Sequence, residues 1–311
     1  MIAIVCPGQG SQTPGFLSPW LELPAFRTRL ESLSEVAGLD LVAHGTTSDA
    51  ETIKDTAVAQ PLIVAAGLAT AAVLLPDGPS SALGVTAGHS VGEITAATLA
   101  GVLSDRDAMT FVRERGQGMA AASAVTATGM SAVLGGDPAE VAAALERHGL
   151  TAANANGAGQ VVAAGTLEQL AALAAEPPAK ARVIPLQVAG AFHTHHMAPA
   201  VEALTALTEG FETQAPSVSL LSNADGAVVS DGPEALTRLV RQVSSPVRWD
   251  LCMQTMVSMG VTTLIELTPA GTLVGLAKRA MPGVTTLALK TPDDLAAAQQ
   301  LVTDQTDASK D

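Results

Sequence analysis

The sequence predicts an α/β protein in which a large unit, built around a mostly parallel sheet, carries a smaller inserted unit. The first observation is a buried strand at Ile2–Cys6 that runs directly into the glycine-rich loop Pro7–Gln12. The second is the alternation of short apolar runs with longer helical patterns, which is typical of parallel sheets with crossover helices. The third is a change in that rhythm between residues 130 and 188, after which the alternation resumes.

Local signals define the elements of the large unit. Asp55 and Thr56 can cap a long apolar helix, and Pro61 lies in its first turn, where proline is tolerated. Ser104, with Asp107 three residues later, opens another helix. In chain order we expect a helix at 57–75, a loop at 76–81, a strand at 83–87, helices at 91–100 and 105–122, and a final strand, helix and strand at 261–267, 273–279 and 285–289.

Six elements between residues 130 and 188 follow the order strand-helix-strand-strand-helix-strand, which is the ferredoxin-like arrangement. Their expected ranges are 130–134, 138–148, 151–155, 161–164, 167–175 and 182–188. We therefore divide the chain into a large unit of residues 1–127 and 192–302 and an inserted unit of residues 128–191. The polar residues 303–311 are expected to form a flexible tail.

Composition and charge argue against several classes of function. The chain has 311 residues, 48% of them apolar and 15% charged, so it can bury a large core. Its formal net charge of −14 and its lack of tyrosine argue against nucleic acid or an anionic membrane as the main partner. The first residues lack the basic region of a signal peptide, and the apolar stretch 62–75 is short for a membrane span. Cys6 and Cys252 give no disulfide framework, so a cytoplasmic protein is expected.

A serine between two glycines stands where a predicted strand meets a predicted helix. In Gly88-His89-Ser90-Val91-Gly92 the turn is so tight that side chains beside the serine would clash, and it lifts the hydroxyl above the sheet. The N–H groups that begin the next helix then point toward a developing oxyanion. This context favours Ser90 as a nucleophile over an ordinary turn with a capping serine.

A cluster of histidines offers the base that an activated serine needs. His193, His195 and His196 follow the predicted inserted unit, and His193 comes directly after an apolar phenylalanine, at the seam that faces the large unit. This place favours His193 as the base that reaches Ser90. A solvated polar turn and a zinc site are the alternatives, although the cluster contains no cysteine or carboxylate, which argues against zinc.

Arg115 lies on the apolar side of its predicted helix. Ala108, Val112 and Met119 follow three- and four-residue spacing, and Arg115 falls on the same stripe. A guanidinium on a core-facing stripe is costly unless it is paired. Either an internal salt bridge satisfies this charge, or its carboxylate partner arrives with the substrate.

Together these motifs resemble the malonyl-coenzyme A:acyl carrier protein transacylases of fatty acid synthesis and the acyltransferase domains of polyketide synthases. The resemblance covers nearly the whole chain and rests on Pro7–Gln12, Gly88–Glu93, Arg115-Gly116, Asn154–Gly165, Gly190–His193, Pro246–Trp249 and Pro269–Gly271. It implies a hydrolase-like large unit, with the active site in the cleft between the two units.

The resemblance also implies catalytic roles. Ser90 would carry the malonyl group as an ester, and His193 would accept and return its proton. The backbone N–H groups of Gln9 and Val91 would hold the oxyanion. The backbone carbonyl of Arg248 would orient His193 in place of a triad carboxylate.

Four further residues would shape the substrate site on the same grounds. Arg115 would pair with the malonyl carboxylate, and Phe192 would narrow the space beside the α-carbon. Asn156 would lie near the entrance. Met119 would line the acyl pocket, although a core position is its more ordinary explanation.

The implied substrate is malonyl-coenzyme A, with acyl carrier protein as a transient partner, no permanently bound cofactor and no metal. A serine esterase or thioesterase, a non-catalytic scaffold and an acyltransferase that serves polyketide synthesis are the alternatives. We expect a free-standing monomer. Carrier proteins are usually acidic, so docking would use basic residues, with candidates Lys180, Arg182, Arg241, Arg248, Lys278 and Arg279.

Overall fold

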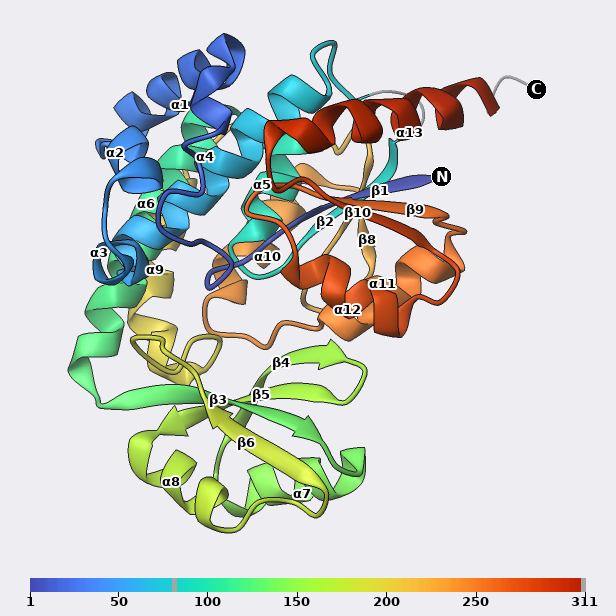
Figure 1. Ribbon diagram of the computed structural model, residues 1–311. Helices are drawn as coiled ribbons and strands as arrows, with labels where there is room; N and C mark the ends of the chain where they lie inside the picture. The colour runs from blue at the N-terminus through green and yellow to red at the C-terminus, as the bar shows by residue number, and fades with distance from the viewer. Residues whose placement is uncertain (80–82, 309–311) are drawn as a thin grey trace.

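The structure, a computed structural model, describes residues 1–79 and 83–308 and contains two β-sheets (Figure 1). The larger sheet has six strands in the order β10-β9-β1-β2-β7-β8, and every neighbouring pair in it is parallel except β7 with β8. Its strands are β1 (Ile2–Cys6), β2 (Leu83–Gly88), β7 (Ser219–Leu221), β8 (Val228–Val229), β9 (Thr263–Glu266) and β10 (Thr285–Ala288). The α/β class and the mostly parallel sheet are confirmed.

Helices cover both faces of this sheet. Successive side chains of a strand point to opposite faces, so each face packs against its own set of helices. Ile2 and Ile4 of β1 belong to the core cluster that includes α4 and α5, whereas Ala3 and Val5 belong to a second cluster with α11 and α12. The helices of this unit are α1 (Pro24–Ala37), α2 (Leu41–Thr46), α3 (Ala50–Lys54), α4 (Thr56–Leu74), α5 (Gly92–Leu99), α6 (Asp105–Val125), α9 (Ala198–Thr208), α10 (Gly232–Gln242), α11 (Trp249–Ser258), α12 (Thr272–Ala280) and α13 (Leu295–Ala308), with short 3-10 helices at Trp20–Glu22, His195–Met197 and Pro292–Asp294.

Helix α4 runs through the middle of the large core. The carboxylate of Asp55 caps it by accepting a hydrogen bond from the N–H of Ala57, and Pro61 lies near its start. By length and apolarity α4 could cross a membrane, but 78% of that segment is buried inside the protein. A helix buried to this degree is the core helix of the large unit.

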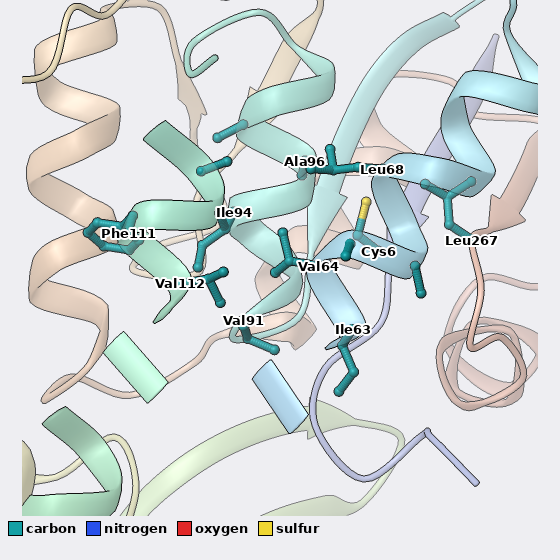
Figure 2. Close-up of a cluster of buried hydrophobic side chains, with 14 of the residues drawn as sticks. Cys6, Ile63, Val64, Leu68, Val91, Ile94, Ala96, Phe111, Val112 and Leu267 are labelled. Atoms are coloured by element: carbon teal, nitrogen blue, oxygen red, sulfur yellow. The ribbon is translucent and has the colours of Figure 1, made fainter. Parts of the chain in front are cut away.

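The core between α4, α5 and α6 also supports the start of α5. Figure 2 shows Val64 of α4, Ile94 of α5 and Val112 of α6 in one cluster, with Val91 at its edge. Val91 directly follows Ser90, and its side chain is fully buried. The turn that carries Ser90 is therefore anchored in the core by the next residue.

The second sheet has four strands in the order β4-β5-β3-β6, and each neighbouring pair is antiparallel. Its elements are β3 (Thr128–Gly135), α7 (Pro138–Arg147), β4 (Thr151–Gly157), β5 (Gln160–Thr166), α8 (Leu167–Ala175) and β6 (Ala181–Pro185). Val133 and Ala163 pack under α7 and α8, whereas Met130 and Val162 join the core of the large unit. Figure 1 accordingly shows this sheet between its two helices and the rest of the molecule.

Strand β4 also bonds directly to the large unit. The N–H of Ala155 donates to the carbonyl of Val247, and the N–H of Val247 donates to the carbonyl of Ala153, each at 2.9 Å. These bonds hold the segment before α11 beside the strand that carries Asn154 and Asn156.

The predicted order of the six inserted elements is confirmed, although β6 ends at Pro185 rather than at residue 188. Of the predicted flexible tail, residues 303–308 continue α13 as a helix, and residues 309–311 lie outside the described residues. Contacts that are distant in sequence order this helix, including hydrogen bonds from Gln299 to the carbonyl of Val73 and from Thr262 to Gln305. Of the loop predicted at 76–81, residues 76–79 form turns and bends, and the remaining residues lie outside the described chain.

Candidate active site

The turn between β2 and α5 holds Ser90 in the left-handed backbone region, with φ of +54°. Its flanking glycines leave no room for a side chain. A Cβ on Gly88 would lie 1.9 Å from the carbonyl carbon of Gly92, and one on Gly92 would lie 2.2 Å from the carbonyl oxygen of Cys6. The pattern Gly-x-Ser-x-Gly is therefore a steric requirement of this turn, which presents the Ser90 hydroxyl at the carboxyl end of β2.

His193 forms a hydrogen-bonded pair with Ser90. Ser90 Oγ lies 2.7 Å from His193 Nε2, and His193 Nδ1 lies 2.8 Å from the backbone carbonyl oxygen of Gln242. A carbonyl oxygen only accepts, so the proton is assigned to Nδ1 and Nε2 is free to accept from the serine. The orienting group is a backbone carbonyl, as the resemblance implied, but the assignment of that carbonyl to Arg248 is wrong.

The local structure explains why Gln242 has this role. It ends α10, and the carbonyls of a last helical turn have no partner within the helix. Arg248 precedes α11 instead, where its N–H donates to the carbonyl of Asn223 at 2.7 Å and its guanidinium pairs with Asp250. The observed position, Gln242, lies six residues before the predicted one, Arg248. The fold, and not the local sequence, places the carbonyl of Gln242 against His193.

Burial keeps the imidazole of His193 neutral. The side chain is 3% exposed, and this burial, assisted by the positive charge of Arg115, lowers the pKa of His193 to about 3. A low pKa means that the proton-accepting form persists well below neutral pH. The pair is therefore set for proton transfer from the serine hydroxyl to Nε2.

Arg115 brings a buried positive charge to the same place. It is 1% exposed, and one terminal nitrogen lies 3.5 Å from Ser90 Oγ. It donates to two neutral amides, at 2.6 Å to Gln60 Oε1 and at 2.8 Å to Gln242 Oε1. Within residues 1–79 and 83–308 no carboxylate forms a salt bridge with its guanidinium, and its Nε has no hydrogen-bond partner. The direct internal salt bridge that the sequence left open is thus not found in the described chain.

Known proteins are similar to this sequence along nearly its whole length. The acyl transferase domain family matches residues 3–300. A malonyl CoA-acyl carrier protein transacylase of Mycobacterium tuberculosis is 51% identical over 296 residues, which cover 95% of this chain and 98% of that protein. The protein of the same name from Escherichia coli K12 is 34% identical over 306 residues, with 96% and 99% covered. The chain belongs to the malonyl CoA-acyl carrier protein transacylase family.

Solved structures agree with this membership. The crystal structure of MCAT from Mycobacterium tuberculosis superposes with a TM-score of 0.93 at 50% identity, covering 96% of this chain and 99% of that one. A type II PKS acyl-carrier protein complex with its malonyl-transacylase, PlMCAT:AntF, contains a chain with a TM-score of 0.90 at 31% identity, with 96% and 99% covered. The chain is accordingly an acyltransferase, as the sequence predicted.

A cavity of about 570 Å³ opens in front of Ser90 in this acyltransferase. Its walls come from the loop after β1, from α12 and from the strands β3, β4 and β5. The predicted residues Gln9, Met119, Asn156 and Phe192 all line it, whereas Arg115 and Val91 are not among the lining residues, although Arg115 contacts the lining residue Ser90. Among the described lining residues the only acidic or basic side chains apart from histidine are Lys54 and Arg279, and both are basic.

Asn156 is held by a neighbour of the nucleophile. His89 Nε2 lies 2.8 Å from Asn156 Oδ1, and the His89 ring packs edge-on against Trp249.

Of the predicted docking residues, Arg279 lines the cavity, whereas Arg241 lines a separate pocket. These two candidates therefore lie at different pockets.

Two backbone N–H groups near Ser90 are free. Neither the N–H of Gln9 nor that of Val91 has a hydrogen-bond acceptor within the residues that the structure describes. Val91 stands at the N-terminus of α5, where such groups point away from the helix. Both positions agree with the predicted oxyanion donors.

Four buried polar residues around the site were not predicted: Gln60, Glu93, Asn223 and Gln242. Gln60 could have been noticed in the sequence, because it is a lone amide inside the long apolar run of α4. Glu93 directly follows the serine motif but carried no mark of its role. Asn223 and Gln242 lie far from the motif in sequence, and no local pattern distinguishes them.

The other two histidines of the cluster do not face Ser90. The rings of His195 and His196 contact one another at a tilt of 34°, with centroids 4.1 Å apart, on the turn after His193. Across the described chain no group of three or more histidine, cysteine, aspartate or glutamate side chains is placed to hold a metal ion. The zinc alternative therefore has no ligand set in these residues.

Proposed function

We propose that this acyltransferase moves a malonyl group from malonyl-coenzyme A to the phosphopantetheine thiol of an acyl carrier protein in fatty acid synthesis, through a malonyl ester on Ser90. One observation carries the choice of acyl group. The Arg115 guanidinium lies 3.5 Å from Ser90 Oγ, and it is buried and bonded only to neutral partners among the residues that the structure describes. A buried guanidinium is stable when a carboxylate meets it, and a malonyl group supplies that carboxylate.

In the first half-reaction Ser90 Oγ attacks the thioester carbonyl carbon. His193 Nε2 takes the hydroxyl proton as the new C–O bond forms, and the carbonyl electron pair moves onto its oxygen. The free N–H groups of Gln9 and Val91 are suited to hold that oxyanion. Its collapse breaks the C–S bond, and the imidazolium returns the proton to the departing thiolate of coenzyme A.

The second half-reaction runs the same transfers with another thiol. His193 accepts the proton of the phosphopantetheine thiol, and the sulfur attacks the ester carbonyl of malonyl-Ser90. The C–Oγ bond then breaks, and the proton passes from His193 back to the serine. The carbonyl of Gln242 holds the imidazole in one tautomer throughout, which is the task of the aspartate in a triad.

The cavity walls account for selection of the acyl group. Arg115 would hold the malonyl carboxylate, so a monocarboxylic acyl group would leave its charge unpaired. Phe192 is 6% exposed and lines the cavity, where it would crowd a substituent on the α-carbon. Met119 lines the same cavity and accepts a weak hydrogen bond from Gln60 at 3.4 Å, which supports a mixed packing and lining role.

We also propose the finer description of the fold. The order β4-β5-β3-β6 with two helices on one face supports a ferredoxin-like inserted unit of residues 128–191. The parallel sheet with the serine turn at its carboxyl edge supports a hydrolase-like large unit of residues 1–127 and 192–302. A cytoplasmic monomer without a permanently bound cofactor remains our prediction.

An acyl carrier protein of polyketide synthesis is the second candidate acceptor. The neighbour PlMCAT is described in complex with a type II PKS acyl-carrier protein, and it resembles this chain over its whole length. Both candidates present the same thiol, so the reaction at Ser90 would be identical. Transfer rates to one carrier protein of each class would decide between them.

Intact-mass spectrometry tests the proposal against hydrolysis and against a non-catalytic role. After incubation with malonyl-coenzyme A, we expect one malonyl adduct that Ser90→Ala abolishes and that moves to holo-acyl carrier protein. Rapid release of free malonate without transfer would indicate a thioesterase. A protein that forms no adduct and turns over no thioester would be a scaffold.

A further inference from the structure

The site contains a buried carboxylate that the proposed mechanism does not use. Glu93, in the first turn of α5, is 3% exposed, and its two oxygens accept hydrogen bonds from separate partners. One accepts from the backbone N–H of Asn223 at 3.2 Å, and the other accepts from Nε2 of Gln242. Within the described chain the Glu93 carboxylate forms no hydrogen bond with Ser90 Oγ and no salt bridge with Arg115, and Glu93 is not a lining residue of the cavity, so any contribution of the carboxylate to the reaction has to pass through a neighbour.

That neighbour is Gln242, whose amide has only one workable orientation. Its Nε2 faces three acceptors: the carbonyl of Ser90 at 3.0 Å, Asn223 Oδ1 at 3.2 Å and the Glu93 carboxylate. Asn223 is itself fixed, because its amide donates to the carbonyl of Gly88 at 2.7 Å and accepts from the N–H of Ser90 at 2.8 Å. The oxygen of the Gln242 amide is thereby turned to Arg115, 2.8 Å away.

We infer that Glu93 is a positioning residue that sets malonyl selectivity through Gln242: it locks the Gln242 amide so that the amide oxygen, and not the NH2 group, faces Arg115. This inference rests on the proposed function. An amide between an anion and a cation aligns its dipole with both charges, so Glu93 balances the buried guanidinium from a distance. A direct ion pair would balance it as well, but a carboxylate in contact with the guanidinium would neutralise it and repel the substrate carboxylate that has to bind there.

Burial acts on both groups, and each charge opposes the effect of burial on the other. Burial lowers the pKa of Arg115 to about 10, and the negative charge of Glu93 opposes that shift. Burial also raises the pKa of Glu93 to about 7, against the hydrogen bonds from Gln242, Asn223 and Ser222 and the positive charge of Arg115, which favour the carboxylate. Gln60 holds the other side of the guanidinium at 2.6 Å, so Arg115 is clamped between two amide oxygens. Of these two amides, Gln242 is the one that also bonds to a carboxylate, that of Glu93.

An isosteric change separates this role from simple packing. Glu93→Gln keeps the shape but supplies one acceptor where two are used. Because the N–H of Asn223 is fixed in the backbone, the remaining oxygen is expected to stay there, and the new NH2 group then meets the NH2 group of Gln242. Gln242 relieves the clash by flipping, which turns its NH2 group toward Arg115 and displaces the guanidinium.

The experiment compares rates of Ser90 acylation by malonyl-coenzyme A and by acetyl-coenzyme A, followed by intact mass. The variants are Glu93→Gln, Gln242→Met, which keeps the backbone carbonyl for His193, and their double variant. Each single change should lower the malonyl-to-acetyl rate ratio at least about tenfold, the effect of roughly 1.4 kcal/mol. The double variant should lose no more than Gln242→Met alone, because Glu93 acts through Gln242.

Glu266 provides a matched control. It is a fully buried carboxylate whose oxygens accept from the backbone N–H groups of Gly271, Leu273 and Val274 at the start of α12. Glu266→Gln should lower the melting temperature and leave the malonyl-to-acetyl ratio within about twofold of the unsubstituted protein.

Three results would overturn the inference. The first is an unchanged ratio in folded Glu93→Gln, and the second is an unchanged ratio in folded Gln242→Met, which tests the relay even if the Glu93 variant fails to fold. The third is a double variant whose loss equals the product of the single losses. If the unsubstituted protein forms no malonyl adduct, the proposed function fails first, and this outcome is distinct from a failure of the relay alone.

Discussion

Replacing Arg115 with alanine should invert the acyl preference at Ser90. In the unsubstituted protein the guanidinium lies 3.5 Å from Ser90 Oγ, in a site where the side chain is 1% exposed. Removing one partner of a buried ion pair costs about 3–5 kcal/mol, because the other charge stays desolvated. For malonyl-coenzyme A this corresponds to a fall in kcat/KM of roughly 200- to 5,000-fold. Acetyl-coenzyme A carries no carboxylate, so its rate should rise.

The assay is stopped-flow or quench-flow acylation of Ser90 with each thioester, scored by intact mass. Arg113→Ala is the matched control, since Arg113 lies on the same helix and, among the described residues, donates only to the carbonyl of Val36 at 3.3 Å. Melting temperatures of both variants show whether the fold survives. Equal losses for malonyl and acetyl groups in a folded Arg115→Ala protein would refute the role of Arg115 as a carboxylate clamp.

Three further outcomes are expected. The pKa of His193 is lowered to about 3, so its neutral form persists below the ordinary pKa of 6.5. The rate of acetyl transfer to Ser90 should therefore stay level from about pH 8 down to about pH 5. A fall in that rate centred near pH 6.5 would contradict this. Gly92→Ala places a Cβ 2.2 Å from the carbonyl oxygen of Cys6, so thermal melting should show a loss of about 1–3 kcal/mol and acylation should fall with it, whereas an unchanged melting temperature would be inconsistent with the turn described here. Phe192→Ala should increase acylation by methylmalonyl-coenzyme A relative to malonyl-coenzyme A in a competition assay, and an unaltered ratio would remove Phe192 from the selection of the acyl group.

The local sequence was sufficient to predict structure wherever the contacts that determine it are local. The turn at Ser90 follows from glycines two residues to either side, since a side chain at Gly88 or Gly92 would strike the backbone. The inward position of Arg115 follows from its spacing on α6, and the structure buries it as that spacing predicts. The order of the six inserted elements could likewise be predicted, because each element has its own apolar pattern.

Local patterns failed where a contact joins distant segments. Composition predicted a flexible tail from residue 303, but α13 continues to Ala308 because it is bonded to the large unit. The resemblance placed the orienting carbonyl at Arg248, whereas the end of α10 puts Gln242 against His193. Nothing within a few residues of either position distinguishes the two.

The sequence by itself predicted Ser90 as a nucleophile and Arg115 as a buried cation, because tight-turn sterics and helical spacing are properties of short segments. It predicted His193 as the base from its place where the inserted unit ends. It also determined the family, through motifs spread along nearly the whole chain. Only the tertiary structure decided what surrounds Arg115: two amide oxygens in contact, and a carboxylate one amide further away. Those hydrogen bonds link α4, α5, α6 and α10, and buried polar groups find such partners only when the helices that carry them pack together.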